Sequence, residues 1–153
     1  MDAIELLKQD HETVRELFAA LDAAAGARDR AELFAELKRT LDVHERLEED
    51  VFYPAARDAG DEAAEIVNQS HDDHAEVDEL IEEMSALDES DEEWLDHLAA
   101  LKEMVDHHVD NEEDVLFPLV QEALADRLDG LLDEMQELEA VLEDEEQERH
   151  QHL

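Results

Sequence analysis

Residues 44–54 read HERLEEDVFYP, and residues 108–118, which begin 64 positions later, read HVDNEEDVLFP. Both stretches share the pattern His-x-x-x-Glu-Glu-Asp-Val, followed by two apolar or aromatic residues and Pro. Residues four apart on an α-helix lie on one face, about one turn apart. The spacing therefore predicts an imidazole beside a carboxylate in each copy, His44 with Glu48 and His108 with Glu112. Iron, manganese and zinc accept such mixed donors.

The repetition extends upstream to two single histidines. His11 is followed by ETVRELF, and His74, 63 positions later, is followed by AEVDELI. Each half of the chain thus has one segment with a single His and a second segment with a His-x-x-x-Glu pair. Two copies are too few for a solenoid. We therefore expect two helical hairpins that form one bundle.

The composition favours an all-helical fold. The chain has 153 residues with only 3 Gly, 2 Pro and no Cys, and Ala, Leu and Glu are good helix formers. A chain of this length fits a single domain. We expect an all-α fold, with an up-down four-helix bundle over residues 1–120. An additional amphipathic helix and a polar tail are expected over residues 121–153.

The charge is strongly negative. The chain carries 49 acidic and 11 basic side chains, a net charge of −38. Such a charge repels nucleic acid and anionic membranes, and the sequence contains no calcium-binding loop of the Asp-x-Asp-x-Asp-Gly type. Adaptation to a salt-rich (halophilic) cytosol is the favoured explanation. No signal peptide or membrane-spanning stretch is recognised, so a cytoplasmic location is expected.

Apolar residues recur every three or four positions, which predicts amphipathic helices. A buried carboxylate needs a compensating partner, and Glu48 falls in the middle of such an apolar stripe. Pro54 is expected to end or kink its helix near the last turn. The final helix could fold back on the bundle or pair with a second copy as a homodimer. The expected helices cover residues 2–25, 29–56, 61–87, 91–117 and 119–146.

Helical phase selects the inward histidines. His11, His44 and His108 lie on their stripes, whereas His107 is rotated about 100° away and is expected to be exposed. On the third helix His74 lies near the centre of the stripe, and His71 is about 60° further out. We therefore prefer His74, with His71 at the edge of the site or behind it.

Six inward donors on four helices suit two metal ions better than one. Two carboxylates can bridge a pair of ions about 3.5–4 Å apart. Imidazole and carboxylate without thiolate favour iron or manganese, and zinc is the alternative. Six-coordinate iron would keep positions for water, an oxo or hydroxo bridge, or a small ligand.

These motifs resemble the hemerythrin-like, HHE cation-binding family over residues 3–120. The resemblance implies a four-helix bundle with a non-haem di-iron centre. It places Glu48 and Glu112 as bridging carboxylates. The oxygen carriers of the family have a His-x-x-x-His on the third helix, so their fifth histidine would here be His71 or missing. The implied ligands are His11, His44, Glu48, His74, His108 and Glu112.

Two classes of function follow. The favoured one is a non-enzymatic di-iron protein that binds or senses dioxygen, nitric oxide or iron. The alternative is a di-iron enzyme that acts on peroxide or nitric oxide, or that repairs iron centres; the repair proteins tend to carry a Cys-bearing region that is not found here.

Overall fold

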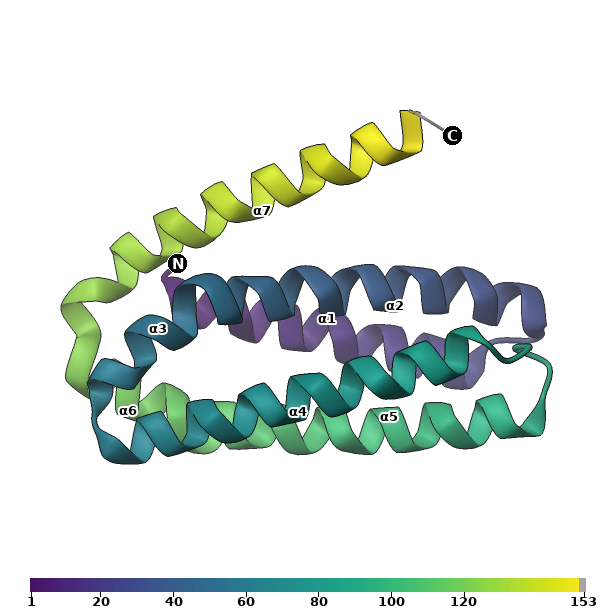
Figure 1. Ribbon diagram of the computed structural model, residues 1–153, viewed down its shortest axis with the longest axis horizontal. Coiled ribbons are helices and arrows are strands. Elements are labelled where there is room, and N and C mark those ends of the chain that lie inside the picture. The colour runs from purple at the N-terminus through teal and green to yellow at the C-terminus, as the bar shows by residue number, and fades with distance from the viewer. Residues whose placement is uncertain (152–153) are drawn as a thin grey trace.

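The computed structural model describes residues 1–151, and the side chains of residues 1–148. Four long helices lie side by side and alternate in direction along the chain, as Figure 1 shows. This is the expected up-down four-helix bundle. Its helices are α1 (Ala3–Ala23), α2 (Ala27–Leu47), α4 (Asp61–Ser85) and α5 (Glu92–Asn111).

Capping and turn chemistry set the ends of the hairpins. The Asp2 carboxylate accepts a hydrogen bond from the Glu5 backbone N–H at 3.0 Å, which caps α1. Gly60 precedes α4 with φ of +124°, a conformation that residues with a Cβ rarely adopt. The two hairpins, α1 with α2 and α4 with α5, then pack together as the bundle.

The second and fourth helices change their winding where the repeated motif lies. α2 leads into a π-helical turn, η1 (Glu48–Phe52), then α3 (Tyr53–Ala56) and the 3₁₀ turn η2 (Arg57–Ala59). α5 leads in the same way into the π-helical turn η3 (Glu112–Leu116) and α6 (Phe117–Leu124). Pro54 acts near the end of its helix, as expected: the α-helical winding stops two residues later, at Ala56, and the chain changes direction between α2 and α3 (Figure 1). The π-helical turn before the proline was not expected.

The C-terminal helix α7 (Leu128–Gln151) runs back over the side of the bundle formed by α1 and α2 (Figure 1). It does not begin at residue 119, because the 3₁₀ turn η4 (Ala125–Arg127) separates it from α6. Arg127 in this turn donates a hydrogen bond at 2.8 Å to Asp58 in η2. The apolar stripe of α7 packs within its own chain, and residues 152–153 of the expected polar tail lie outside the described range. The buried stripe residues are Leu128, Leu131, Met135 and Leu142.

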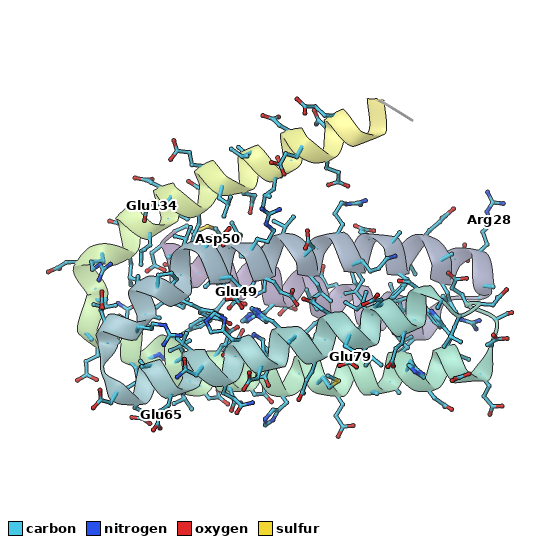
Figure 2. The ribbon with its side chains drawn as sticks, viewed as in Figure 1. Arg28, Glu49, Asp50, Glu65, Glu79 and Glu134 are labelled. Carbon is cyan, nitrogen blue, oxygen red and sulfur yellow. The ribbon has the colours of Figure 1, made fainter. Side chains whose placement is uncertain are left out.

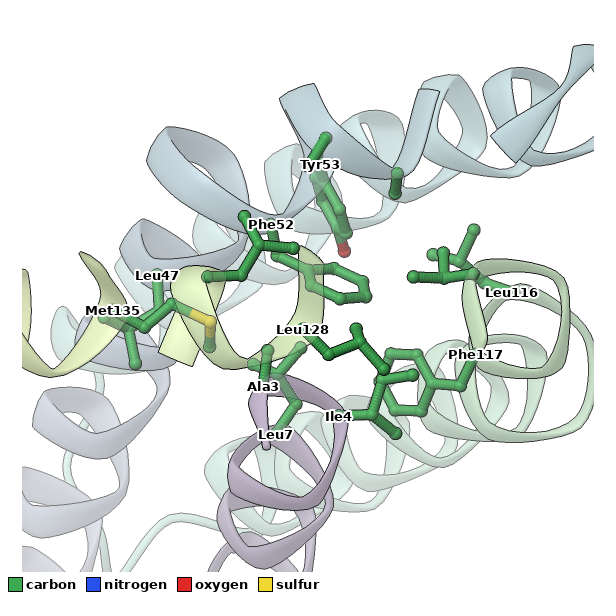
Figure 3. Close-up of a cluster of buried hydrophobic side chains, with 14 of the residues drawn as sticks. Ala3, Ile4, Leu7, Leu47, Phe52, Tyr53, Leu116, Phe117, Leu128 and Met135 are labelled. Carbon is green, nitrogen blue, oxygen red and sulfur yellow. The ribbon is translucent and has the colours of Figure 1, made fainter. Parts of the chain in front are cut away.

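Two apolar clusters flank the level at which the histidines lie. The cluster at the α3, α6 and α7 end joins Leu47, Phe52 and Phe117 to Met135 (Figure 3). The cluster at the opposite end contains Trp94, which packs edge-on against Phe34 with ring centroids 5.4 Å apart. Polar side chains between two dry clusters are shielded from water, which strengthens their mutual electrostatics.

Candidate metal centre

Each π-helical turn begins at one of the two inward glutamates, Glu48 and Glu112. The Tyr53 N–H bonds to the Glu48 carbonyl five residues earlier, and the Phe117 N–H bonds to the Glu112 carbonyl in the same way. A proline one residue further on lacks an N–H and clashes with the carbonyl four residues before it, which favours a wider turn. Isolated π turns are frequent at functional sites. Here they fix the level and direction of Glu48 and Glu112.

The four inward histidines point their Nε2 atoms at these two carboxylates. His44 Nε2 and His74 Nε2 lie 3.2 and 3.1 Å from Glu48 Oε1. His11 Nε2 and His108 Nε2 lie 3.1 and 3.3 Å from Glu112 Oε1. All six side chains are buried, and both glutamates are 0% exposed. The structure thus brings together all six residues that the sequence assigned to the site.

A second ring of carboxylates holds the opposite nitrogens. Glu113 lies 2.7 Å from His11 Nδ1, and Asp10 lies 3.0 Å from His44 Nδ1. In the other half, Glu49 lies 2.7 Å from His74 Nδ1 and Asp73 lies 3.3 Å from His108 Nδ1. A carboxylate on Nδ1 fixes the tautomer and leaves Nε2 free as a metal donor. In Figure 2 the label of Glu49 lies between α2 and α4, beside this group of nitrogen- and oxygen-bearing side chains, and its own side chain is partly exposed.

Sequence reasoning missed these four outer carboxylates, although a signal was present. An Asp directly precedes the single His in both halves, and a Glu directly follows the inward Glu in both halves. Asp10 and Asp73 hold the histidine of the next helix, whereas Glu49 and Glu113 hold that of the opposite hairpin. The repeat therefore encodes the supports of the site as well as its inner donors.

His71 lies outside the inner group. Its side chain is 40% exposed, and its Nδ1 pairs with Glu49, the same carboxylate that holds His74. In the other half the outer carboxylate Glu113 is held instead by Arg15 at 3.5 Å. His71 thus supports the site from behind, the second of the two positions that helical phase allowed.

Tyr53 is a polar residue of the centre that sequence reasoning did not assign. Its hydroxyl donates a hydrogen bond to Glu112 Oε2 at 2.7 Å and lies 3.4 Å from His74 Nε2 and 3.5 Å from His108 Nε2. Its ring stacks on His74, and Phe117, the equivalent residue of the other half, stacks on His11. The repeat therefore matches in ring stacking and differs by one hydroxyl group.

The electrostatics show how strongly the cluster favours positive charge. Burial alone would lower the pKa of His44 and His108, but nearby carboxylates, above all Glu48 and Glu112, raise both values well above the usual range. Burial alone would raise the pKa of Glu48, yet the surrounding histidines hold it well below its usual value. Protons on imidazole thus supply the positive charge that a metal ion would otherwise provide.

The donor geometry fits metal ions. His11, His44, Glu48 and Glu112 offer four donor atoms that all lie within 4.8 Å of one another, and Glu48, His74 and His108 form a second such group. Buried polar atoms are rarely left without a partner. Two buried atoms in this cluster make no hydrogen bond, namely His44 Nε2 and Glu48 Oε2. His44 Nε2 lies 3.2 Å from Glu48 Oε1 but without hydrogen-bond geometry. Both atoms are therefore available as metal donors.

A small cavity of about 20 Å³ adjoins the four histidines. A cavity of about 10–15 Å³ on this measure holds one water molecule, so the space suits a water or a diatomic molecule. Glu45 is the one acidic side chain of its wall, and burial together with a hydrogen bond to Asp78 raises its pKa to about 9. The aliphatic residues of the wall are Val14, Leu41, Val77, Val105 and Val109.

Two known proteins resemble the chain over most of its length. The chain is 28% identical over 125 residues to a DNA nickase from a Nostoc species, covering 82% of this chain but only 35% of the nickase. It is 27% identical over 126 residues to the uncharacterized protein Rv2633c of Mycobacterium tuberculosis, covering 77% of this chain and 71% of that protein. The present chain thus spans about a third of the nickase and most of the mycobacterial protein.

A solved structure shares the fold. The crystal structure of a hemerythrin HHE cation binding domain-containing protein, the Rv2633c homolog from Mycobacterium kansasii, superposes with a TM-score of 0.81 at 26% identity. The match covers 93% of this chain and 87% of that one. The family model of the hemerythrin HHE cation binding domain matches residues 2–120, which include all six inward donors. The chain therefore belongs to the hemerythrin HHE cation-binding domain family.

Proposed function

We propose that the protein holds two iron ions and uses them to bind or sense a small diatomic molecule, dioxygen or nitric oxide, in the cytoplasm. One observation carries this proposal. The two donor groups, which have Glu48 in common, lie beside a cavity of about 20 Å³ that is lined by the same four histidines. The aliphatic wall of the cavity suits an apolar diatomic better than a charged substrate. The absence of thiolate donors supports iron or manganese over zinc.

Each group of residues has a distinct role in this proposal. His11 and His44 would hold one ion, His74 and His108 the other, and Glu48 and Glu112 would provide the carboxylates between them. Two bound iron ions would supply a redox-active centre with positions open to a small ligand. The outer carboxylates keep the four Nε2 atoms turned inward. The valine- and leucine-lined wall limits the water that reaches the centre.

A second candidate is a di-iron enzyme that acts on peroxide or nitric oxide, or on damaged iron centres. Tyr53 favours it, because its hydroxyl donates to Glu112 Oε2 and lies within 3.5 Å of two of the inward nitrogens, which puts a transferable proton beside the metal donors. The activity named for the Nostoc relative is a less attractive third option, because a net charge of −38 opposes binding to DNA. No helix among the described residues has the length and apolar character to span a bilayer.

Rapid mixing of the iron-loaded protein with dioxygen, nitric oxide and peroxide separates the two candidates. A binding protein should give a reversible optical change with a gas and little turnover of peroxide. An enzyme should consume many equivalents of its substrate per chain. Glu112→Ala is the test variant, and His107→Ala is the control because His107 is exposed beside the buried His108. Equal behaviour of the two variants would contradict the proposed site.

A further inference from the structure

We infer that the small ligand enters the inner cavity through the α1–α5 seam, the line along which α1 and α5 pack, and that Val14, Val105 and Val109 form the gate. The α2–α4 seam is its counterpart in the repeat and stays closed. The inference rests on the proposed function and adds to it the route and the kind of ligand that this route admits.

A surface groove of about 410 Å³ runs along the α1–α5 seam. Its lining includes Arg15 on α1 and both Asp106 and Asp110 on α5. The residue directly before each of these three lines the inner cavity instead. These inner residues are Val14, Val105 and Val109, all buried. A single layer of valine side chains therefore separates the groove from the cavity.

An aliphatic layer of this kind selects among ligands by charge. An ion that crosses it must lose its hydration with no polar group to replace the water, which is very costly. An uncharged diatomic molecule loses little, because its own hydration is weak. The gate therefore suits dioxygen or nitric oxide and resists small anions.

The α2–α4 seam differs at the level of the cavity. Glu45 is linked to Asp78 by a hydrogen bond across this seam, and Glu45 also lines the cavity. In the repeat, Val109 takes the place of Glu45. Arg15 takes the place of Asp78 and pairs instead with Glu113 at 3.5 Å. The α2–α4 seam is thus tied across beside the cavity, whereas the α1–α5 seam is held there by apolar contacts.

Exposed ion pairs hold the two ends of the groove. Lys102 on α5 pairs with Asp22 on α1 at 3.2 Å, and the two side chains are 44% and 56% exposed. At the other end, Arg15 pairs with Glu113, and both are partly exposed. Exposed ion pairs contribute little to stability and are screened by salt. The α1–α5 seam can therefore open briefly at small cost.

Val105 and Leu41 are equivalent in the repeat and give a matched pair of variants. Both are buried in the cavity wall, so Val105→Ala and Leu41→Ala enlarge the cavity from opposite seams. Stopped-flow mixing of the ferrous protein with nitric oxide gives the association rate, and a nitric oxide scavenger gives the dissociation rate. Both rates should be at least about fivefold higher in Val105→Ala than in Leu41→Ala, with dissociation constants within about threefold, because a gate changes rates and not the equilibrium.

Lys102 and Lys38 are a second matched pair, outside the cavity wall. Lys38 donates to Ser85 across the α2–α4 seam at 3.4 Å, in the place that the pair of Lys102 with Asp22 occupies on the α1–α5 seam. In dilute buffer, Lys102→Ala should raise the association rate about two- to fivefold. Molar salt should raise the wild-type rate to a similar level, because it screens the same ion pair. Lys38→Ala should match the wild-type protein in both buffers.

Metal-free protein provides a readout that does not depend on iron. Dissolved dioxygen is paramagnetic and speeds the NMR relaxation of the methyl groups that it reaches. Under dioxygen pressure, the methyl groups of Val14 and Val105 should respond more strongly than those of Val77 and Leu41, their counterparts on the α2–α4 seam. Stronger relaxation on the α2–α4 side would overturn the route.

Equal rate gains in Val105→Ala and Leu41→Ala, or in Lys102→Ala and Lys38→Ala, would also overturn it. An iron-loaded wild-type protein that gives no optical change with nitric oxide would instead count against the proposed function. The relaxation measurement would still decide the route, so the two failures are distinguishable. Helical circular dichroism identifies a variant that does not fold, and in that case the lysine pair and the relaxation measurement carry the test.

Discussion

The two halves of the chain agree in the donors of the site and differ in what surrounds them. Both present a single His, a His-x-x-x-Glu pair, a π-helical turn and an outer carboxylate on each imidazole. They differ at two equivalent positions of the repeat, where Tyr53 corresponds to Phe117 and Glu45 to Val109. They differ also in the residue that pairs with the outer carboxylate: His71 pairs with Glu49, and Arg15 with Glu113. Residues that match should therefore be needed for metal binding itself, and residues that differ should distinguish the two halves.

The largest effect should come from removing a carboxylate at the centre. Glu48 and Glu112 each lie beside histidines of both pairs, so Glu48→Ala and Glu112→Ala should each abolish the two-ion centre and leave at most about one ion per chain. Elemental analysis after gel filtration measures both. His107→Ala should keep the metal content of the wild-type protein. If His107→Ala lost as much metal as His108→Ala, the assignment of the inward residues would be wrong.

Glu45 should make stability depend on pH in a way that Val109 cannot. Its pKa rises from 4.5 to about 9 in the folded protein, so the folded chain retains a proton that the unfolded chain releases. Stability should then fall as pH rises from 4.5 towards 9, by an upper bound of about 3 kcal/mol at pH 7, since one pKa unit corresponds to about 1.4 kcal/mol. Glu45→Gln should remove this loss.

Urea unfolding of the metal-free protein at pH 5 and pH 7 checks the Glu45 prediction. The stability advantage of Glu45→Gln over wild type should widen with pH. Glu76→Gln, at an exposed position on α4, is the control and should follow the wild-type protein. Parallel pH profiles for wild type and Glu45→Gln would show that the buried carboxyl does not retain its proton.

Removing the charge of an outer carboxylate should have a smaller effect on metal binding, and each half of the chain offers one such residue for the test. Glu49→Gln and Glu113→Gln should each weaken metal binding by about 10–100-fold without abolishing it, because they orient an imidazole and do not touch the metal. Competition with a chelator of known affinity gives the dissociation constants. The exposed neighbours provide controls, since Asp114→Asn should bind metal as the wild type does. If both Gln variants bound metal as tightly as the wild-type protein, the outer carboxylates would have no role in metal binding.

Salt should affect both halves alike and by the smallest amount. With 49 acidic and 11 basic side chains, the metal-free chain repels itself in dilute buffer, and molar salt shortens the Debye length to about 3 Å. The melting temperature should rise with salt by a few degrees, which corresponds to an increase in the free energy of unfolding on the order of 1 kcal/mol. Bound iron should add its own increment at every salt concentration. A melting temperature indifferent to salt would contradict the salt-adaptation hypothesis.

Helical periodicity and the internal repeat were sufficient to predict the bundle and the six inward residues. Both rest on local spacing, since positions three and four apart on a helix must share a face. The choice of His74 over His71, and of His108 over His107, followed from the same rule. The structure places His74 and His108 in the cluster and leaves His107 at the surface.

The winding of the helices and the polar neighbours of the site were not predictable in this way. Strict α-helical periodicity carries no information on a π turn, so the widening at Glu48–Phe52 was missed, although the helix does end near Pro54, at Ala56. Tyr53 and Glu45 lie beside obvious metal donors and looked like ordinary residues of the motif. Only the packing of α4 against α2 reveals that Glu45 meets Asp78.

The metal content of the wild-type protein tests the central claim most directly. Protein purified without chelator, loaded anaerobically with ferrous iron and freed of excess metal, should contain two iron ions per folded chain. This value follows from the proposal that each of the two donor groups sharing Glu48 holds one ion. A content near zero, in protein whose helical circular dichroism is intact, would contradict the account.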